Sequence, residues 1–292
     1  MRVSDKSLFE QSRRQLQQRR AEVLKAQRQA TTLRRVERAS DDPVAAALES
    51  RHRLRQRRAE AHGKAAEGGL DELRAADQAL GTASELLRRA RELAVQMASD
   101  TVGAEQRAAA AEEVDQMRET LRALANTEVA GRYVFAGYAE RTPPFDAAGT
   151  YVGGPAPRER EVAPGLRLPT APTGDEAFGP GGGTDLFAAL EAFATALRAD
   201  DRAGIQAAIG ATEAGHDQLV QARAAVGARQ QAFEAARNVA RQVADRSVER
   251  QQELSGLDAM EAFSRLQQLD GALQAAVRIA ARLPLPSLAE QG

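Results

Sequence analysis

Apolar residues recur every seven positions along much of the chain, which is the pattern of long helices that pack on one another. In the first 33 residues this stripe is narrow, and Arg and Gln lie on either side of it. A helix with so little apolar surface needs a partner helix to cover it. The stripe consists of Phe9, Leu16, Val23, Ala26, Ala30 and Leu33.

The first stripe stops at a Ser-Asp-Asp-Pro sequence, residues 40–43. Asp41 or Asp42 can accept hydrogen bonds from the free backbone N–H groups at the start of a helix. Pro43 suits the first helical position, because an N–H group there would have no partner within the helix. The sequence therefore predicts a break followed by a capped second helix.

The second predicted helix runs from Pro43 to about Ser99 and carries the strongest periodicity in the chain. Large residues occupy one heptad position and mostly alanines the other, which favours close helix packing. The glycines Gly63, Gly68 and Gly69 weaken its middle and favour a kink there. The two heptad positions hold Leu73, Leu80, Leu87 and Ala94, and Ala76, Ala83, Ala90 and Met97.

A turn at residues 100–103 leads to a third predicted helix, residues 104–125, which we expect to fold back on the second as an antiparallel hairpin. The helical period then stops. Eight of the eleven prolines lie between residues 140 and 183. This composition predicts a loop-rich middle with a few short strands, projecting outward from the helices.

Helical periodicity returns near residue 185 and continues to the end of the apolar pattern, with a bend expected at Gly256. Its seam includes Val226, Phe233, Leu266, Leu273 and Leu283. The predicted fold is mainly α: long antiparallel or coiled-coil helices from both termini pack together and carry a small loop-rich outer insert with room for β structure. The predicted segments are an N-terminal arm helix at 1–42, a long helical hairpin of the core at 43–137, a Pro/Gly-rich outer insert at 138–183 and a C-terminal helical arm at 184–292.

Charge is uneven along the chain although the total is close to neutral. The formal net charge is −1, but residues 1–60 hold 16 Lys or Arg against 8 Asp or Glu. A basic segment of this kind can bind nucleic acid or an acidic partner. Its arginines alternate with Gln and Glu as on the solvated face of a helix, so we expect no nucleic-acid binding.

Candidate catalytic and metal-binding chemistry is sparse. The chain contains no cysteine, which excludes disulfides, thiol catalysis and Cys-based zinc sites. The histidines His52, His62 and His216 do not have metal-ligand spacing. We therefore expect no enzyme, no metal site and no cofactor. The sequence also predicts neither a cleaved secretory signal nor membrane insertion, because no apolar stretch is long enough for a span.

Several short segments share their order and spacing with one known family. Residues 39–46 read Ala-Ser-Asp-Asp-Pro-Val-Ala-Ala, residues 88–96 read Arg-Arg-Ala-Arg-Glu-Leu-Ala-Val-Gln, and residues 131–138 read Gly-Arg-Tyr-Val-Phe-Ala-Gly-Tyr. Together they resemble the FlgL-type hook-filament junction proteins of the bacterial flagellin superfamily. Residues 32–35 depart from the family pattern, because Leu33 stands where the family tends to have glycine. The matching positions of the later motifs are Asn126, Gly131, Arg132, Tyr133, Phe135, Gly137, Gly227 and Arg229.

The resemblance implies a structural, hook-associated component of the flagellum that forms a ring at the junction between hook and filament. It further implies contacts with the preceding hook-associated protein and with flagellin. An export chaperone and the flagellar export apparatus would carry the chain, without a cleaved signal, to the extracellular flagellum. In this family the terminal regions tend to fold only on assembly, when they form coiled coils.

Two other functions remain open from the sequence. One is a flagellin-like subunit of the filament with a reduced outer region. The other is a cytoplasmic coiled-coil or DNA-binding protein, for which the basic first segment is the only support.

Overall fold

The computed structural model describes residues 2–280, and their side chains from residue 10 onward. It contains two compact units, which are described separately below. The first unit combines Met1–Arg57 with Ala244–Gly292, and the second is Arg58–Val243. The helices are α1 (Arg2–Thr32), α2 (Pro43–Met97), α3 (Ala104–Ala125), α4 (Gly174–Phe178), α5 (Leu186–Arg198), α6 (Arg202–Ser255) and α7 (Ala259–Ala280).

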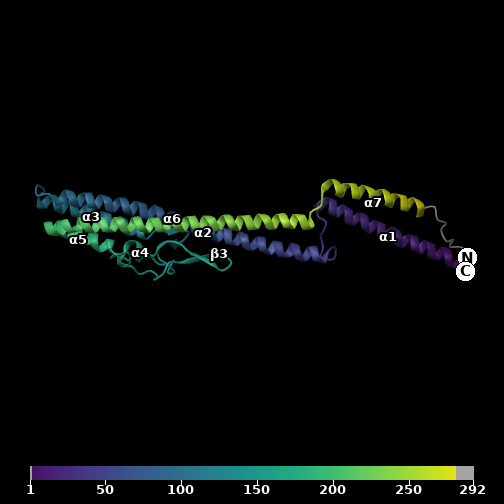
Figure 1. Ribbon diagram of the computed structural model, residues 1–292, viewed down its shortest axis with the longest axis horizontal. Coiled ribbons are helices and arrows are strands. Elements are labelled where there is room, and N and C mark those ends of the chain that lie inside the picture. The colour runs from purple at the N-terminus through teal and green to yellow at the C-terminus, as the bar shows by residue number, and fades with distance from the viewer. Residues whose placement is uncertain (1, 281–292) are drawn as a thin grey trace. The chain divides into compact units, whose positions relative to one another are not determined.

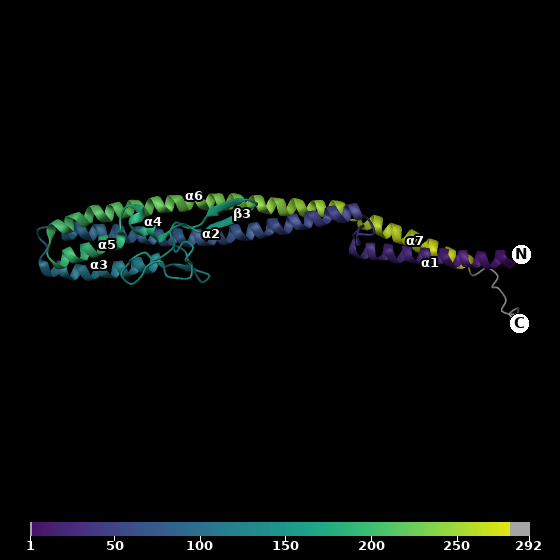
Figure 2. The ribbon, with the colours of Figure 1, turned by 90° about the horizontal axis from the view of Figure 1, so that it is seen from below.

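The second unit is a bundle of long helices. The helix α3 folds back along α2, and Arg89 lies 3.3 Å from Glu113 across the hairpin. The helices α3 and α5 pack together, and α6 runs beside α2 in both views (Figures 1 and 2). The predicted helix 104–125 and its antiparallel hairpin with the second helix are confirmed. The core of the bundle includes Leu73, Leu80, Leu87, Ala94, Met97, Val114, Leu121, Val226 and Phe233.

The helix α2 is uninterrupted through Gly63, Gly68 and Gly69. These glycines serve packing: a methyl group at Gly69 would overlap the ring of Phe233, and one at Gly68 would meet the guanidinium of Arg160. The missing side chain at Gly69 lets α6 place a large ring directly against the backbone of α2. The helix therefore has no break where the sequence suggested a weak point.

The middle segment forms two short antiparallel hairpins, β1 with β2 and β3 with β4. Its aromatic side chains reach into the helical core: the rings of Phe135 and Phe178 meet edge to face with centroids 5.1 Å apart, and Phe145 is 2% exposed. The insert predicted from the sequence is therefore packed onto the helices through these rings, because they gain more from the core than from water. The strands are β1 (Glu128–Val129), β2 (Arg132–Tyr133), β3 (Glu159–Ala163) and β4 (Leu166–Pro169), followed by the 3-10 turn η1 (Pro180–Gly182).

Polar contacts also hold this segment on the helices. The side-chain amide of Asn126 donates to the carbonyl of Phe145 and accepts from its N–H, both at 3.0 Å. The guanidinium of Arg229 on α6 donates to the carbonyl of Thr170 at 2.6 Å. The buried carboxylate of Glu72 on α2 pairs with Arg158 and Arg160 from the insert. A buried carboxylate needs such paired donors, since burial without them is costly.

Arg107 on α3 is the largest fully buried polar side chain of the described residues, with 1% of its surface exposed. Its guanidinium donates to the carbonyls of Met97 at 2.9 Å and Ser99 at 3.0 Å. It also pairs with Asp200, which follows α5 in a left-handed conformation with φ 57°. One side chain therefore joins the α2–α3 turn to the α5–α6 turn.

We expect Arg107→Met to lower the free energy of unfolding of the second unit by about 3 kcal/mol, because the carbonyls of Met97 and Ser99 lose their donor and Asp200 loses its ion pair. Urea unfolding followed by circular dichroism measures this loss. The matched control is Arg198→Met, at a half-exposed guanidinium that pairs with Asp115 and Glu112 at the surface. Its loss should stay below about 1 kcal/mol. Equal losses in the two variants would contradict the assigned role of Arg107.

Candidate functional site

The first unit carries the features that point to assembly, in two parts. One is the pair of helices α1 and α7, called here the terminal arm. The other is the joint, defined as residues 33–42 and 256–258 together with the adjoining turns of α2 and α6. Both parts lie within the same compact unit.

At the joint, backbone hydrogen bonds connect two interhelical links that lie far apart in sequence, like the rungs of a short β-ladder. The N–H of Arg35 donates to the carbonyl of Ser255 at 2.7 Å, and the N–H of Leu257 donates to the carbonyl of Leu33 at 2.9 Å. Gln29 adds a side-chain donor to the carbonyl of Arg35 at 2.7 Å. The link between α1 and α2 is thereby tied to the link between α6 and α7.

Leu33 does not continue the seam of α1, contrary to the sequence-based expectation. The helix ends at Thr32, and Leu33 takes a left-handed conformation with φ 51° and 42% of its surface exposed. This conformation is unfavourable for leucine because its Cβ crowds the backbone, whereas glycine has no Cβ and adopts it freely. The ladder to Leu257 holds the backbone in this conformation.

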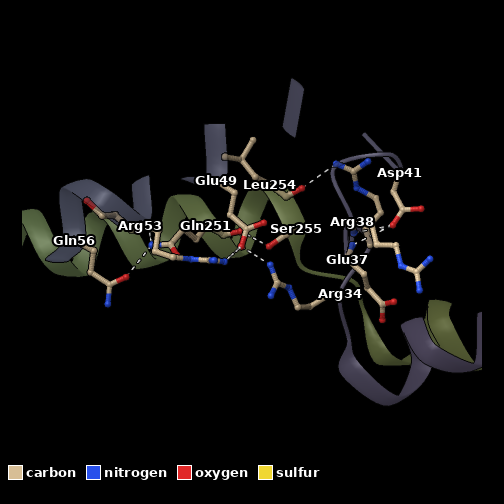
Figure 3. Close-up of polar contacts among 12 residues, drawn as sticks. Arg34, Glu37, Arg38, Asp41, Glu49, Arg53, Gln56, Gln251, Leu254 and Ser255 are labelled. Carbon is tan, nitrogen blue, oxygen red and sulfur yellow. Dashed lines mark hydrogen bonds and ion pairs between the residues drawn. The ribbon is translucent and has the colours of Figure 1, made fainter. Parts of the chain in front are cut away.

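Ion pairs surround the ladder (Figure 3). The carboxylate of Glu49 on α2 is 7% exposed and accepts from Arg34 of the joint and, at 2.6 Å, from Arg53 one turn further along α2. Arg35 donates to the carbonyl of Leu254 at 2.8 Å. These charge-assisted hydrogen bonds fix the direction in which α2 leaves the joint.

The two aspartates of the Asp-Asp-Pro sequence have different roles. Asp42 caps α2, because its carboxylate accepts from the N–H of Ala45 at 2.9 Å, and this contact lowers its pKa. Asp41 instead closes the joint: it pairs with Lys25 of α1 at 2.7 Å and accepts from the N–H of Arg38 at 3.0 Å. The bond from Lys25, followed by that from Arg38, lowers the pKa of Asp41 to about 2.

The terminal arm has a seam that two helices leave partly open. The helices α1 and α7 pack together, as the sequence predicted for the two ends of the chain. Only the alanines Ala26, Ala30 and Ala262 are buried in this seam, among the residues whose side chains are described. The larger members remain partly exposed: Leu16, Val23, Leu266, Leu269 and Leu273. In the second unit, by contrast, the seam leucines are fully buried.

Exposed apolar side chains also gather in the first unit. Fifteen large apolar residues of the described chain are exposed, and nine of them belong to this unit. Phe263 on α7 is 54% exposed and Met260 is 80% exposed. Apolar surface exposed to water does not stabilise a monomer, whereas burying it in a subunit interface would stabilise the assembly.

The remaining candidate residues are placed as follows. The seam residues Leu73, Leu80, Leu87, Met97, Val226 and Phe233 lie inside the second unit and face no surface. The side chain of Phe9 and all of Leu283 lie outside the described residues. Three of the family-motif residues hold the insert on the helices: Asn126, Phe135 and Arg229. Gly131 (φ 78°) and Gly137 (φ 59°) occupy turns, and Gly227 is on α6. The guanidinium of Arg132 lies 3.5 Å from the carboxylate of Glu140, and the N–H of Tyr133 donates to the backbone carbonyl of Glu140.

The part of the chain that the structure describes forms no cluster of metal-binding side chains. It contains no group of three or more His, Asp or Glu side chains arranged to hold a metal ion. His216 lies 3.0 Å from the hydroxyl of Ser84 between α6 and α2, where it packs two helices. Among residues 2–280, none of the helices has the length and hydropathy that a membrane span requires.

Glu49, Glu72 and Arg107 are the polar residues that sequence reasoning missed. Each lies on a helix among many other charged residues, and its spacing does not distinguish it from them. In the sequence, Gly68 was the one residue that could have indicated such a contact, because its missing side chain makes room for Arg160, which pairs with Glu72.

Comparison with known proteins gives a consistent result. Residues 3–140 match the family model of the bacterial flagellin N-terminal helical region. The chain is 29% identical over 212 residues to flagellar hook-associated protein 3 of Escherichia coli, which covers 68% of this chain and 67% of that protein. The protein of the same name in Salmonella typhimurium is 29% identical over 180 residues, covering 61% of this chain and 57% of that protein.

Solved structures match the fold. A putative flagellar hook-associated protein from Vibrio parahaemolyticus superposes with a TM-score of 0.65 and 19% identity, covering 73% of this chain and all of that chain. FlgL from Bacillus cereus gives a TM-score of 0.58 and 20% identity, covering 70% of this chain and 97% of that chain. At such identities the likeness establishes the helical fold.

We expect Leu33→Gly to stabilise the joint by about 0.5–1 kcal/mol, because relief of the left-handed strain exceeds the added chain entropy. Hydrogen exchange at the amides of Arg35 and Leu257 reports local opening. The matched control is Leu24→Gly, at an exposed position inside α1, where glycine should cost about 1 kcal/mol. Faster exchange in Leu33→Gly than in wild type would contradict the strain.

The Asp41 carboxyl should titrate near pH 2 in the folded chain, below its ordinary value of 3.8. Because the folded pKa is lowered, the contact with Lys25 contributes above about pH 4 and is lost as the pH falls through 2. Lys25→Met should move the midpoint upward in a carboxyl carbon NMR titration. Lys64→Met, at an exposed lysine on α2, should leave it in place. An unchanged midpoint in Lys25→Met would exclude the contact.

Proposed function

We propose that the chain belongs to the bacterial flagellin superfamily and is a structural, hook-associated component of the flagellum that forms the junction between hook and filament. The hook-associated relatives and the shared helical fold support this role. The observation that carries it in this chain is the terminal arm, whose larger seam residues stay partly exposed when α1 and α7 are already paired.

The open seam argues for self-assembly. Fully burying a Leu side chain contributes about 1.5–3 kcal/mol, and two paired helices realise only part of that for Leu16, Leu266 and Leu273. A ring of identical subunits would place further helices against these residues and complete the burial. We therefore propose that the chain assembles as a ring through its terminal arms.

The other proposed partners follow from the position of such a ring between the hook and the filament. One face of such a ring meets the preceding hook-associated protein, and the other face meets flagellin. Before assembly the open seams need protection, which is the role we propose for an export chaperone. The proposed route is the flagellar export apparatus, delivering an extracellular structural protein that is not an enzyme.

Localisation in cells tests the function directly. A strain without the gene should make hooks that lack attached filaments, and the wild-type gene should restore them. Immunogold labelling of the restored flagella should give a band at the hook-filament junction. Label along the whole filament would instead support the flagellin-like alternative, and label confined to the cytoplasm would exclude both.

Leu273→Asp should abolish filament attachment, because it places a charge in the seam that neighbouring arms must cover. The second unit should keep its urea unfolding curve, and the variant should still be exported. The matched control is Gln268→Asp, which puts the same charge on the exposed side of α7 and should attach filaments normally. Normal attachment in Leu273→Asp would contradict assembly through this seam.

A further inference from the structure

One face of α2 in the first unit is both apolar and basic, and its side chains are exposed among the residues that the structure describes. Val44, Leu48, Arg51 and Arg55 follow one another at intervals of four, three and four residues, so they lie on one side of the helix. Val44 is 70% exposed and Leu48 is 37% exposed. We call these four residues the basic face.

The charges of the basic face have no partner in the part of the chain that the structure describes. Arg53, on another side of the same helix, pairs with Glu49. Arg51 and Arg55 are exposed, and no carboxylate of residues 10–280 lies within ion-pair distance of either guanidinium. An exposed stripe that combines aliphatic residues with unpaired arginines suits an acidic helix as its partner.

A complementary face occurs on α6 in the second unit. Glu213, Asp217, Val220 and Ala224 follow the same intervals of four, three and four residues, and all four are exposed. Val220 is 47% exposed. Asp217 has no ion pair among the described residues, and Glu213 has only a surface contact of 3.6 Å with Arg91. We call these four residues the acidic face.

Arg91 contacts Glu213, whereas two arginines of α6 are turned to other partners. Arg223 donates to Asp77 on α2 at 3.0 Å, and Arg229 donates to the carbonyl of Thr170. Neither arginine offsets the charge of Glu213 and Asp217 toward solvent. The acidic face therefore presents two carboxylates and two small aliphatic residues, with Asp217 unpaired among the described residues and Glu213 offset only by its surface contact with Arg91.

We infer that the basic face of one copy docks antiparallel on the acidic face of a second copy, an inference that rests on the self-assembly proposed above. The shared spacing sets a single register, in which Arg55 meets Glu213, Arg51 meets Asp217, Leu48 meets Val220 and Val44 meets Ala224. Each helix segment rises about 17 Å over these residues, so the contact is small and acts together with the terminal arms.

The two faces differ, and this determines how copies can join. Where the basic face of one copy meets the acidic face of the next, each subunit still has one face of the other kind to offer, so the contact can continue from copy to copy as a heterologous contact. Two basic faces repel each other, and so do two acidic faces. The contact can thus build a ring or a helical array in which every subunit uses both faces.

Cross-linking is a clean test because the chain has no cysteine of its own. Leu48→Cys and Val220→Cys, each on a separately tagged copy, are expressed together in the deletion strain and treated on intact cells with a short bis-maleimide. The contact predicts a product that carries both tags. The control pair is Val95→Cys with Val220→Cys, since Val95 is also an exposed valine on α2, 53% exposed. Equal yields from the two pairs would overturn the contact.

Charge reversal tests the register independently. Arg51→Glu with Arg55→Glu should lower the two-tag yield about tenfold, because attraction becomes repulsion at two positions. Adding Glu213→Lys and Asp217→Lys to the same chain should restore it. Arg57→Glu with Arg246→Glu changes the net charge equally at exposed positions off this face and should leave the yield unchanged. Failure of the four-fold variant to recover would overturn the proposed pairing.

The same cells separate this inference from the proposed function. Junction labelling with no preference for the Leu48–Val220 pair would overturn the contact and leave the junction role standing. A preferred Leu48–Val220 product without junction labelling would overturn the junction role and leave the contact standing. The Arg51→Glu and Arg55→Glu chain should retain the urea unfolding curve of its second unit, since neither residue belongs to that unit.

Discussion

The structure depends on one packing constraint: a helix with a narrow apolar seam must have that seam covered by another helix. In the second unit several helices and the insert meet, and Leu80 and Phe233 lose all contact with water. In the first unit α1 and α7 meet along the seam, and Leu16 and Leu273 keep part of their surface in water. The same sequence pattern therefore gives a closed core in one unit and an open one in the other.

Buried charges fix the places where the chain reverses or joins. Arg107 joins two turns of the bundle, Glu72 anchors the insert, and Glu49 receives two arginines at the joint. Such groups add little net stability compared with apolar residues of the same size, but leaving one unpaired is costly. Seams of Leu and Ala alone would let the helices slide along one another. The paired charges therefore select one arrangement of the helices.

Sequence patterns predicted what depends on local periodicity and missed what depends on distant contacts. The bounds of α3 and the pairing of α1 with α7 followed from heptads and turn residues. The end of α1 before Leu33 did not, because the ladder to Ser255 and Leu257 sets it, more than 200 residues further along the chain. The docking of the insert was missed because its core aromatics, such as Phe145 and Phe178, follow no helical or strand period.

The long helices also show how one periodicity can serve two purposes. Along α2 the inner positions, such as Ala59 and Leu73, are buried within the chain, and the outer positions of the basic face keep the same three- and four-residue steps. Like charges on the outer stripes repel each other between copies, which opposes random association. In the proposed contact, opposite signs on α2 and α6 would allow only unlike faces to meet, so the charges that oppose random association would also give the copies a direction.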